Sequence, residues 1–326
     1  MKNLLEVINN SHKHIKILKV MWECTNACNL RCSHCLTDSG FPLKGELTTK
    51  EAYQLFEILQ QIGVKEIDFT GREPTLRKDL VELVDYAKNL NLKVNLFTNG
   101  TADLNLYSKL TKYINAVQLS IYSTKEQVHD SITGVKGSLR RALRTLKLLK
   151  DSGVDLIISF IVMKANFQDL RDVMVLAKEY DAKFRLGILL PIGRARKNLK
   201  DLMLSPDEVS DFIQKNEEEI RGTINHSVYV RLTETYFKKF DVVPCPLDTI
   251  TVTATGDVIA CSGLRDYIAG NVKRADVNKL RKIIRQLTSF RLNVLNVHNI
   301  ETCSKCELRY ACMGGCRAIT YTYLNQ

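Results

Sequence analysis

Three cysteines near the N-terminus have a spacing that suits an iron–sulfur cluster. Cys28, Cys32 and Cys35 form the pattern C-x3-C-x2-C directly after an apolar, strand-like run. Protein [4Fe-4S] clusters usually take four cysteine thiolates. A set of three therefore predicts a cluster with one iron left open for a substrate or cofactor. This prediction makes the three cysteines both metal ligands and candidate catalytic residues.

Zinc and disulfides are the alternatives for such a group of cysteines. A zinc site favours two C-x2-C pairs or a cysteine–histidine partner pair, and His34 lies too close to Cys32 and Cys35 to complete one. The first residues mix lysines into apolar positions without a secretory signal pattern, and no stretch reaches the roughly 18 apolar residues of a membrane span. We therefore expect a cytoplasmic protein with no membrane contact, in which grouped cysteines serve metal or redox chemistry.

Composition indicates a globular chain with a basic surface. Its 326 residues are 45% hydrophobic and 25% charged, which suffices for one large domain and a smaller one, and the formal net charge is +11. Such a charge favours an acidic partner: a peptide leader, a flavodoxin- or ferredoxin-type electron donor, or nucleic acid. No nucleic-acid motif accompanies it, which argues against the last. The basic stretches 139–150, 194–200 and 273–285 are interpreted as solvated helix faces and a loop.

Strand-like and helix-like runs alternate along the first two thirds of the chain. We expect strands at 17–25, 66–70, 93–98, 116–122, 155–163 and 183–190, and helices at 48–62, 77–90, 104–112, 139–151 and 167–180. Thr48 and Glu51 have the spacing of a capping box at the first helix. This alternation predicts a parallel α/β layout whose functional residues collect at the carboxyl ends of the strands. Periodicity alone does not choose between an open sheet and a barrel.

Short motifs follow these strands in a fixed order. They are Thr70-Gly71-Arg72-Glu73-Pro74, Thr98-Asn99-Gly100, Ser120 in Ser120-Ile121-Tyr122, and Pro191-Ile192-Gly193-Arg194-Ala195. Each is weak alone, because a single glutamate is usually a surface carboxylate and Asn-Gly is an ordinary turn. In this order after the cysteine triad, the set resembles the radical S-adenosylmethionine (radical SAM) superfamily over nearly the whole chain.

The resemblance implies a partial (β/α)6 barrel in which the open iron chelates the amino and carboxylate groups of S-adenosylmethionine (SAM). In that family an electron from the cluster cleaves SAM to methionine and a 5'-deoxyadenosyl radical, which abstracts a substrate hydrogen. It also implies cofactor-binding roles for His34, Gly71, Glu73, Asn99, Ser120 and Arg194.

Arg72 departs from the family's Gly-Gly-Glu-Pro motif. An arginine tolerates a positive φ poorly. Either the local turn differs here, or an extra cation lies beside the cofactor.

The C-terminal third carries a second cysteine pattern. Cys245-x10-Gly256-x4-Cys261 surrounds a strand–turn–strand pattern, and Cys303-x2-Cys306-x5-Cys312-x3-Cys316 follows. The arrangement resembles the SPASM extension of radical SAM enzymes, which holds auxiliary [4Fe-4S] clusters; structural zinc is the alternative. By that resemblance one auxiliary cluster takes Cys245, Cys261 and Cys316, and a second takes Cys303, Cys306 and Cys312.

The family's seventh cysteine is absent, so each auxiliary cluster is one thiolate short. We expect an N-terminal segment at 1–16, a partial barrel at 17–222, and a small Cys-rich α+β extension with a β-hairpin and loops at 223–326.

Extra clusters favour an oxidative reaction, because a substrate radical that ends as an oxidised product must lose an electron that a nearby cluster can accept. A redox-neutral product would instead need a hydrogen donor such as Tyr122 or Cys24, although Cys24 is interpreted first as a small buried residue at a strand end. The sequence thus predicts a radical SAM oxidoreductase of the SPASM subfamily that crosslinks or otherwise oxidises a ribosomally made peptide. Two alternatives stay open: maturation of a small cofactor precursor, such as tetrapyrrole side-chain decarboxylation, and a non-catalytic iron–sulfur electron-transfer protein.

Overall fold

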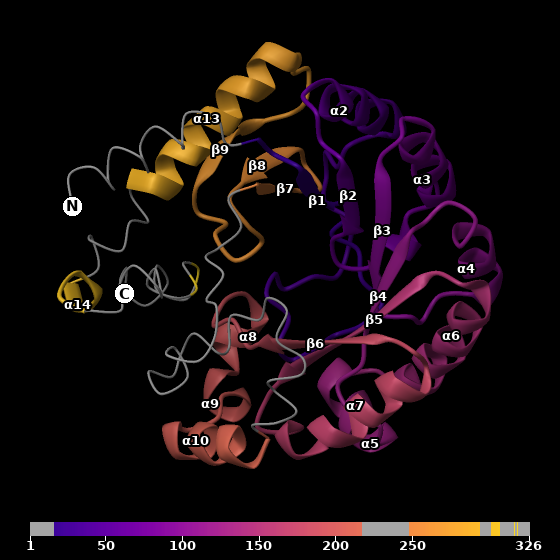
Figure 1. Ribbon diagram of the computed structural model, residues 1–326, viewed down its shortest axis with the longest axis vertical. Helices are drawn as coiled ribbons and strands as arrows, with labels where there is room; N and C mark the ends of the chain where they lie inside the picture. The colour runs from indigo at the N-terminus through magenta and orange to yellow at the C-terminus, as the bar shows by residue number, and fades with distance from the viewer. Residues whose placement is uncertain (1–15, 217–247, 294–300, 307–315, 317, 319–326) are drawn as a thin grey trace.

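A nine-stranded sheet organises the residues that the computed structural model describes, which are 16–216, 248–293, 301–306, 316 and 318. The strand order is β6-β5-β4-β3-β2-β1-β7-β8-β9, and the sheet curves with helices along its outer side (Figure 1). Its first six strands are parallel: β1 Lys19–Glu23, β2 Glu66–Thr70, β3 Lys93–Thr98, β4 Ala116–Ser120, β5 Asp155–Val162 and β6 Lys183–Ile188.

The C-terminal part continues this sheet. Strand β7 (Thr249–Val252) pairs parallel with β1, and β8 (Asp257–Ile259) and β9 (Ile268–Asn271) follow antiparallel. The expected hairpin is therefore present at β7 and β8, but it extends the barrel sheet. Helix α13 (Val277–Asn293) lies beside β9, and the short α14 (Glu301–Ser304) follows. The proposed boundary at residue 222 lies outside the described residues.

Helices connect the parallel strands, as the alternating pattern predicts. They are α2 Thr49–Gln61, α3 Leu80–Asn89, α4 Leu104–Leu110, α5 Glu126–Thr133, α6 Ser138–Ser152 and α7 Leu170–Glu179, with the 3-10 turns η2 Pro74–Leu76 and η3 Phe167–Asp169. Helix α5 was not predicted, because eight residues carry little periodic signal. After β6 come α8 Arg194–Lys197, α9 Leu199–Leu202 and α10 Pro206–Lys215, so the stretch interpreted as a basic loop contains two short helices.

Strand alternation separates an apolar outer face from a more polar inner face. In β1, Val20 and Trp22 are fully buried toward the helices, where Trp22 makes edge contacts with Phe56 and Phe69 at centroid distances of 5.3 and 5.4 Å. The predicted capping box at Thr48 and Glu51 is confirmed and fixes the start of α2.

The fold prediction of an α/β protein with a partial barrel is confirmed, since no closed barrel forms among the described strands. Among the described helices, none combines the length and apolar character that crossing a bilayer requires.

Candidate active site

The three-cysteine loop leaves the carboxyl end of β1 and is fastened to its surroundings through its backbone. The Cys28 N–H donates to Gly40 O at 2.9 Å, and the N–H groups of Arg31 and Ser33 donate to carbonyls at the end of α5 at 2.8 and 2.9 Å. Cys28, Cys32 and Cys35 form no disulfide and are partly exposed. Cys24, in contrast, is fully buried, as predicted.

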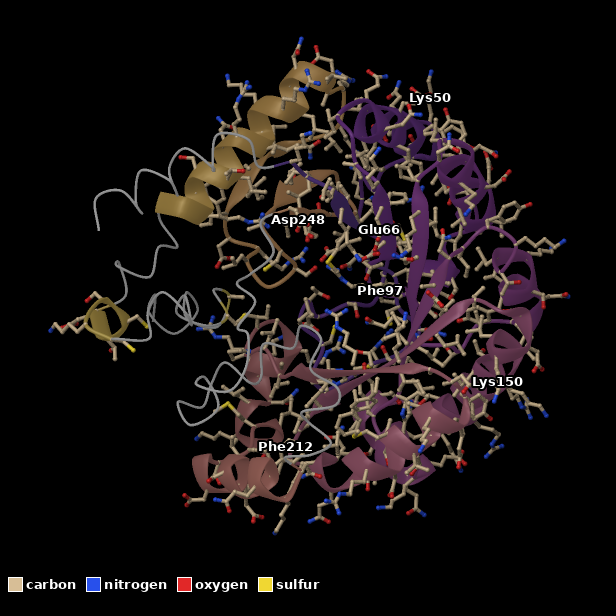
Figure 2. All side chains as sticks on the ribbon, in the orientation of Figure 1. Lys50, Glu66, Phe97, Lys150, Phe212 and Asp248 are labelled. Atoms are coloured by element: carbon tan, nitrogen blue, oxygen red, sulfur yellow. The ribbon has the colours of Figure 1, made fainter. Side chains whose placement is uncertain are left out.

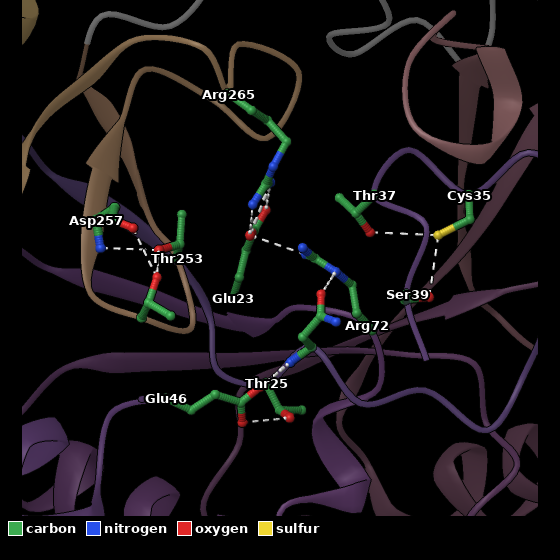
Figure 3. A network of polar contacts seen from close by, with 12 residues as sticks. Glu23, Thr25, Cys35, Thr37, Ser39, Glu46, Arg72, Thr253, Asp257 and Arg265 are labelled. Atoms are coloured by element: carbon green, nitrogen blue, oxygen red, sulfur yellow. Dashed lines mark hydrogen bonds and ion pairs between the residues drawn. The ribbon is translucent and has the colours of Figure 1, made fainter. Parts of the chain in front are cut away.

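The local environment treats the three thiols differently. Burial raises the pKa of Cys28, and it raises the pKa of Cys32 to about 12. Burial also opposes ionisation of Cys35, but hydrogen bonds with Ser39 (3.3 Å) and Thr37 (3.5 Å) outweigh it and lower its pKa (Figure 3).

Unbridged thiols on one loop at a strand end fit the donor set of an iron–sulfur cluster, and the positive charge of bound iron would stabilise their thiolates. Among the described residues, no three or more His, Cys, Asp or Glu side chains lie close enough together to hold one metal ion.

Arg194 braces the cysteine loop from the end of β6. Its guanidinium donates to Cys32 O and Ser39 O, both at 2.9 Å, and to Asp38 Oδ1 at 3.0 Å. Its backbone N–H also donates to Cys35 O at 2.8 Å. All of these contacts are with the loop that carries the cysteines, so Arg194 orders the loop.

Gly193 allows this close approach. Its φ is +59°, and a Cβ built there would lie 2.4 Å from Leu36 C and 2.5 Å from Leu36 O. Any larger residue would push the segment after β6 away from the cysteine loop.

The turn after β2 is organised by a buried glutamate. Glu73 is fully buried and accepts hydrogen bonds from Thr98 Oγ1 and the Asn99 N–H, both at 2.7 Å, and from the Thr75 N–H at 3.1 Å. Burial raises its pKa despite these bonds. Asn99 in turn donates from its side chain to Asn29 Oδ1 at 2.9 Å, which links the turn after β3 to the cysteine loop. The structure thus brings two of the predicted residues, Glu73 and Asn99, into direct contact.

Gly71 is the second glycine that the site requires. Its φ is +123°, and a Cβ would lie 2.8 Å from Thr25 O. Arg72, which replaces the family's second glycine, is not among the four described non-glycine residues with positive φ. The turn therefore accommodates an arginine without left-handed backbone strain.

The Arg72 side chain joins a buried ionic network that the sequence did not predict. Its guanidinium lies 3.0 Å from Glu23 Oε2 and donates to Asn26 Oδ1 at 3.1 Å. Arg265, which follows β8, donates to both oxygens of the same glutamate at 2.9 to 3.1 Å (Figure 3). Burial opposes ionisation of Glu23, but the two arginines outweigh it and lower its pKa. The network ties the turn after β2 to the C-terminal extension.

His34, within the cysteine loop, packs against a cluster of aromatic rings. Its ring centroid is 4.5 Å from that of Tyr122, which also stacks on His129 at 5.5 Å. His34 Nδ1 is buried without a hydrogen-bond partner in the described structure, and burial lowers the pKa of this histidine to about 4. Ser120 ends β4, two residues before Tyr122. Tyr122 is itself buried.

The structure describes four of the six cysteines that were predicted to hold auxiliary clusters. Cys261, Cys303, Cys306 and Cys316 are all partly exposed, whereas Cys245 and Cys312 lie outside the described residues. A Cβ on Gly263 would lie 2.7 Å from the Cβ of Ala318. The loop after Cys261 therefore packs beside the residue two positions beyond Cys316. The two auxiliary ligand sets stay predictions.

Comparison with known proteins gives consistent matches across the chain. A family model described as the Radical SAM superfamily matches residues 22–177. An AdoMet-dependent heme synthase from Oleidesulfovibrio alaskensis is 28% identical over 93% of this chain and 83% of its own length. The mycofactocin maturase MftC of Mycobacterium tuberculosis is 29% identical over 92% of this chain and 78% of its own length. Streptococcus suis SuiB bound to its precursor peptide SuiA superposes with a TM-score of 0.72 at 16% identity, over 100% of this chain and 77% of SuiB.

Proposed function

We propose that this chain, whose residues 22–177 match the Radical SAM superfamily model, is a SPASM-subfamily enzyme that oxidatively modifies a ribosomally made peptide. The observation that carries the proposal is the convergence of three segments at the carboxyl edge of one sheet. They are the cysteine loop, the turn held by Glu73 and the segment of Arg194. A [4Fe-4S] cluster with SAM would supply a 5'-deoxyadenosyl radical for hydrogen abstraction.

Each predicted residue has a role in this scheme. Cys28, Cys32 and Cys35 hold the cluster, and the backbone at Gly71 receives the amino-group end of SAM. Glu73 keeps that turn and the turn at Asn99 together. Arg194 acts as a positioning residue, because its side chain holds the backbone of the loop that carries the ligands.

His34 contacts Tyr122, which follows Ser120 by two residues. We assign the adenine side of SAM to His34 and the ribose or carboxylate side to Ser120. The orphan nitrogen of His34 is the observation that suits a further polar partner there.

A peptide is the proposed substrate. The net charge of +11 suits an acidic leader peptide and an acidic flavodoxin- or ferredoxin-type donor. SuiB, which shares this fold, was solved with its precursor peptide. The heme synthase relative favours a second candidate, the modification of a small cofactor precursor.

Anaerobic reconstitution tests the proposal. After reduction in the presence of SAM, the protein should form 5'-deoxyadenosine and methionine, and the triple variant Cys28→Ala/Cys32→Ala/Cys35→Ala should form neither. Short peptides and tetrapyrrole precursors offered as substrates are then compared by mass spectrometry for loss of hydrogen or of carbon dioxide. Deoxyadenosine formation no higher than that of the triple variant would refute the proposed activity.

A further inference from the structure

The inner face of the curved sheet carries a row of polar side chains along the middle of its strands. In β3, Val94 and Leu96 pack in the core toward the helices, so Asn95 and Phe97 project to the opposite face. Figure 2 shows Phe97 on this concave side of the sheet. By the same alternation, the inner face takes Gln118 of β4, Arg185 of β6 and Thr251 of β7.

Arg185 is a cation on this face without an anionic partner. Its Nη1 donates to Gln118 Oε1 at 2.7 Å, and no ion pair of Arg185 occurs within the described ranges. The carboxylates of Asp68, whose charge acts on Arg185 without an ion pair, and of Glu66 are engaged with Lys19 at 2.8 and 2.6 Å. Arg185 retains exposed surface, while the protein around it desolvates its guanidinium and lowers its pKa.

The contact with Arg185 fixes how Gln118 is oriented. Arginine only donates hydrogen bonds, so the glutamine atom that faces it must be the amide oxygen. The Gln118 amide nitrogen is then left as a further donor next to the guanidinium. Together the two side chains present N–H groups alone, an arrangement that suits the two oxygens of a carboxylate.

Unsatisfied acceptors lie farther around the same face. Asn95 uses its Nδ2 toward Asp68 and Glu66, at 2.8 and 2.7 Å, and its Oδ1 is buried without a partner in the described structure. The Thr251 hydroxyl is likewise buried and without a described partner. Both side chains are more than nine-tenths buried, and buried polar atoms in native proteins normally have partners. The inner face thus offers the donors of Arg185 and Gln118, whereas these two unpaired oxygens are closed to solvent.

We propose that Arg185 and Gln118 form a carboxylate-binding subsite that anchors an acidic residue of the peptide substrate on the inner face of the sheet. This inference rests on the proposed peptide function and adds the chemical class that the site selects. The carboxylate can come from a glutamate or aspartate side chain or from a peptide C-terminus.

Protection of Arg185 from an arginine reagent tests the subsite. The reconstituted holoenzyme is treated anaerobically with phenylglyoxal, and modification of Arg185 is followed by peptide mass mapping. The probes are Ac-Gly-Glu-Gly-NH2, Ac-Gly-Gly-Gly-OH and the neutral Ac-Gly-Gln-Gly-NH2. A ligand at twice its Kd leaves a third of the sites empty, so an acidic probe at that level should slow modification about threefold. The exposed Arg281 on α13 should react at an unchanged rate.

The arms of this experiment separate the sources of the carboxylate. If only the glutamate peptide slows the modification of Arg185, the subsite binds a side-chain carboxylate. If only the triglycine acid slows it, the subsite binds a peptide C-terminus. Equal rates with the acidic and neutral peptides would overturn the subsite. Protection by SAM alone, equal to that by the peptides, would also overturn it, because Arg185 would then bind the cofactor.

Two matched variants keep the test independent of folding. Gln118→Glu supplies a carboxylate from within, so Arg185 should react about threefold or more slowly without any probe, and the glutamate peptide should add no protection. Gln60→Glu on the exposed face of α2 makes the same chemical change and should alter neither rate. Protection without deoxyadenosine formation would count against the proposed enzyme activity alone, whereas deoxyadenosine formation without protection would count against the subsite alone.

Discussion

Replacing Arg194 with methionine should loosen the cysteine loop while keeping the length of the side chain. The substitution removes two hydrogen bonds of 2.9 Å to the backbone carbonyls of Cys32 and Ser39, and one to the surface residue Asp38. The backbone bond from residue 194 to Cys35 O remains. The loop should therefore keep its fold but open more often.

The structure sets the size of this effect. A hydrogen bond to a charged group contributes about 1.5–3 kcal/mol. Only the two bonds to loop carbonyls count here, because the pair with Asp38 is at the surface. The Arg194 side chain is 17% exposed, so water replaces part of what is lost. We expect a net loss of about 2–3 kcal/mol, which raises the population of the open loop roughly 30–150-fold.

Iron release measures that opening. Anaerobically reconstituted protein is mixed with a ferrous chelator, and the rate of colour formation is compared between wild type and Arg194→Met. If chelation proceeds through the open loop, the rate should rise by at least about tenfold, and hydrogen exchange in residues 35–39 should accelerate in parallel.

Lys197→Met is the matched control. Lys197 contacts the same Asp38 at 2.8 Å but is 71% exposed and does not touch the cysteine loop backbone. Exposed ion pairs contribute about 0–1 kcal/mol, so chelation should change less than about fivefold. Equal chelation rates in wild type and Arg194→Met would refute the role of Arg194 as a brace.

Three further predictions concern packing, charge and pH. Gly193→Ala should prevent iron incorporation, because its Cβ would clash with Leu36; iron and sulfide analysis measures this. The control Gly153→Ala places its Cβ where no atom lies within 4 Å, so it should cost only the backbone strain of about 1–2 kcal/mol. Glu23→Gln leaves two arginines without their carboxylate, so the free energy of unfolding, measured with urea, should fall by about 3–5 kcal/mol. The exposed Asp211→Asn should lower it by less than about 1 kcal/mol. A smaller loss for Glu23→Gln than for Asp211→Asn would contradict the network's role. Burial lowers the pKa of His129 to about 4 from 6.5, so the unfolded state binds more protons between these values and stability should fall as the pH drops from 6.5 to 4. The fall should be shallower in His129→Asn, and an unchanged pH slope would show that His129 does not carry it.

Local patterns in the sequence predicted local structure well. The positions of β2 and β3, the capping box at Thr48 and the burial of Cys24 all follow from neighbouring residues, and all agree with the structure. The contact between Asn99 and Glu73 follows from topology, since parallel strands end at one edge.

Contacts between distant segments could not be predicted in this way. Arg194 was interpreted as part of a basic loop and, from the resemblance, as a cofactor-binding residue, but its side chain reaches a carbonyl 162 residues away. Glu23 and Arg265 are 242 residues apart, and neither has a neighbour in sequence that signals the other. A charged residue inside an apolar strand was the one local sign that Glu23 needed a partner.

The parallel pairing of β1 with β7 has a consequence for biosynthesis. Lys19 and Thr249 are register partners, so the hydrogen-bonding edge of the first strand waits for a strand about 230 residues farther along the chain. At a synthesis rate of roughly 5–20 residues per second, that wait lasts about 10–45 s. During this interval the nascent chain exposes an unpaired edge that can aggregate, and a ribosome-bound chaperone would have a defined segment to shield.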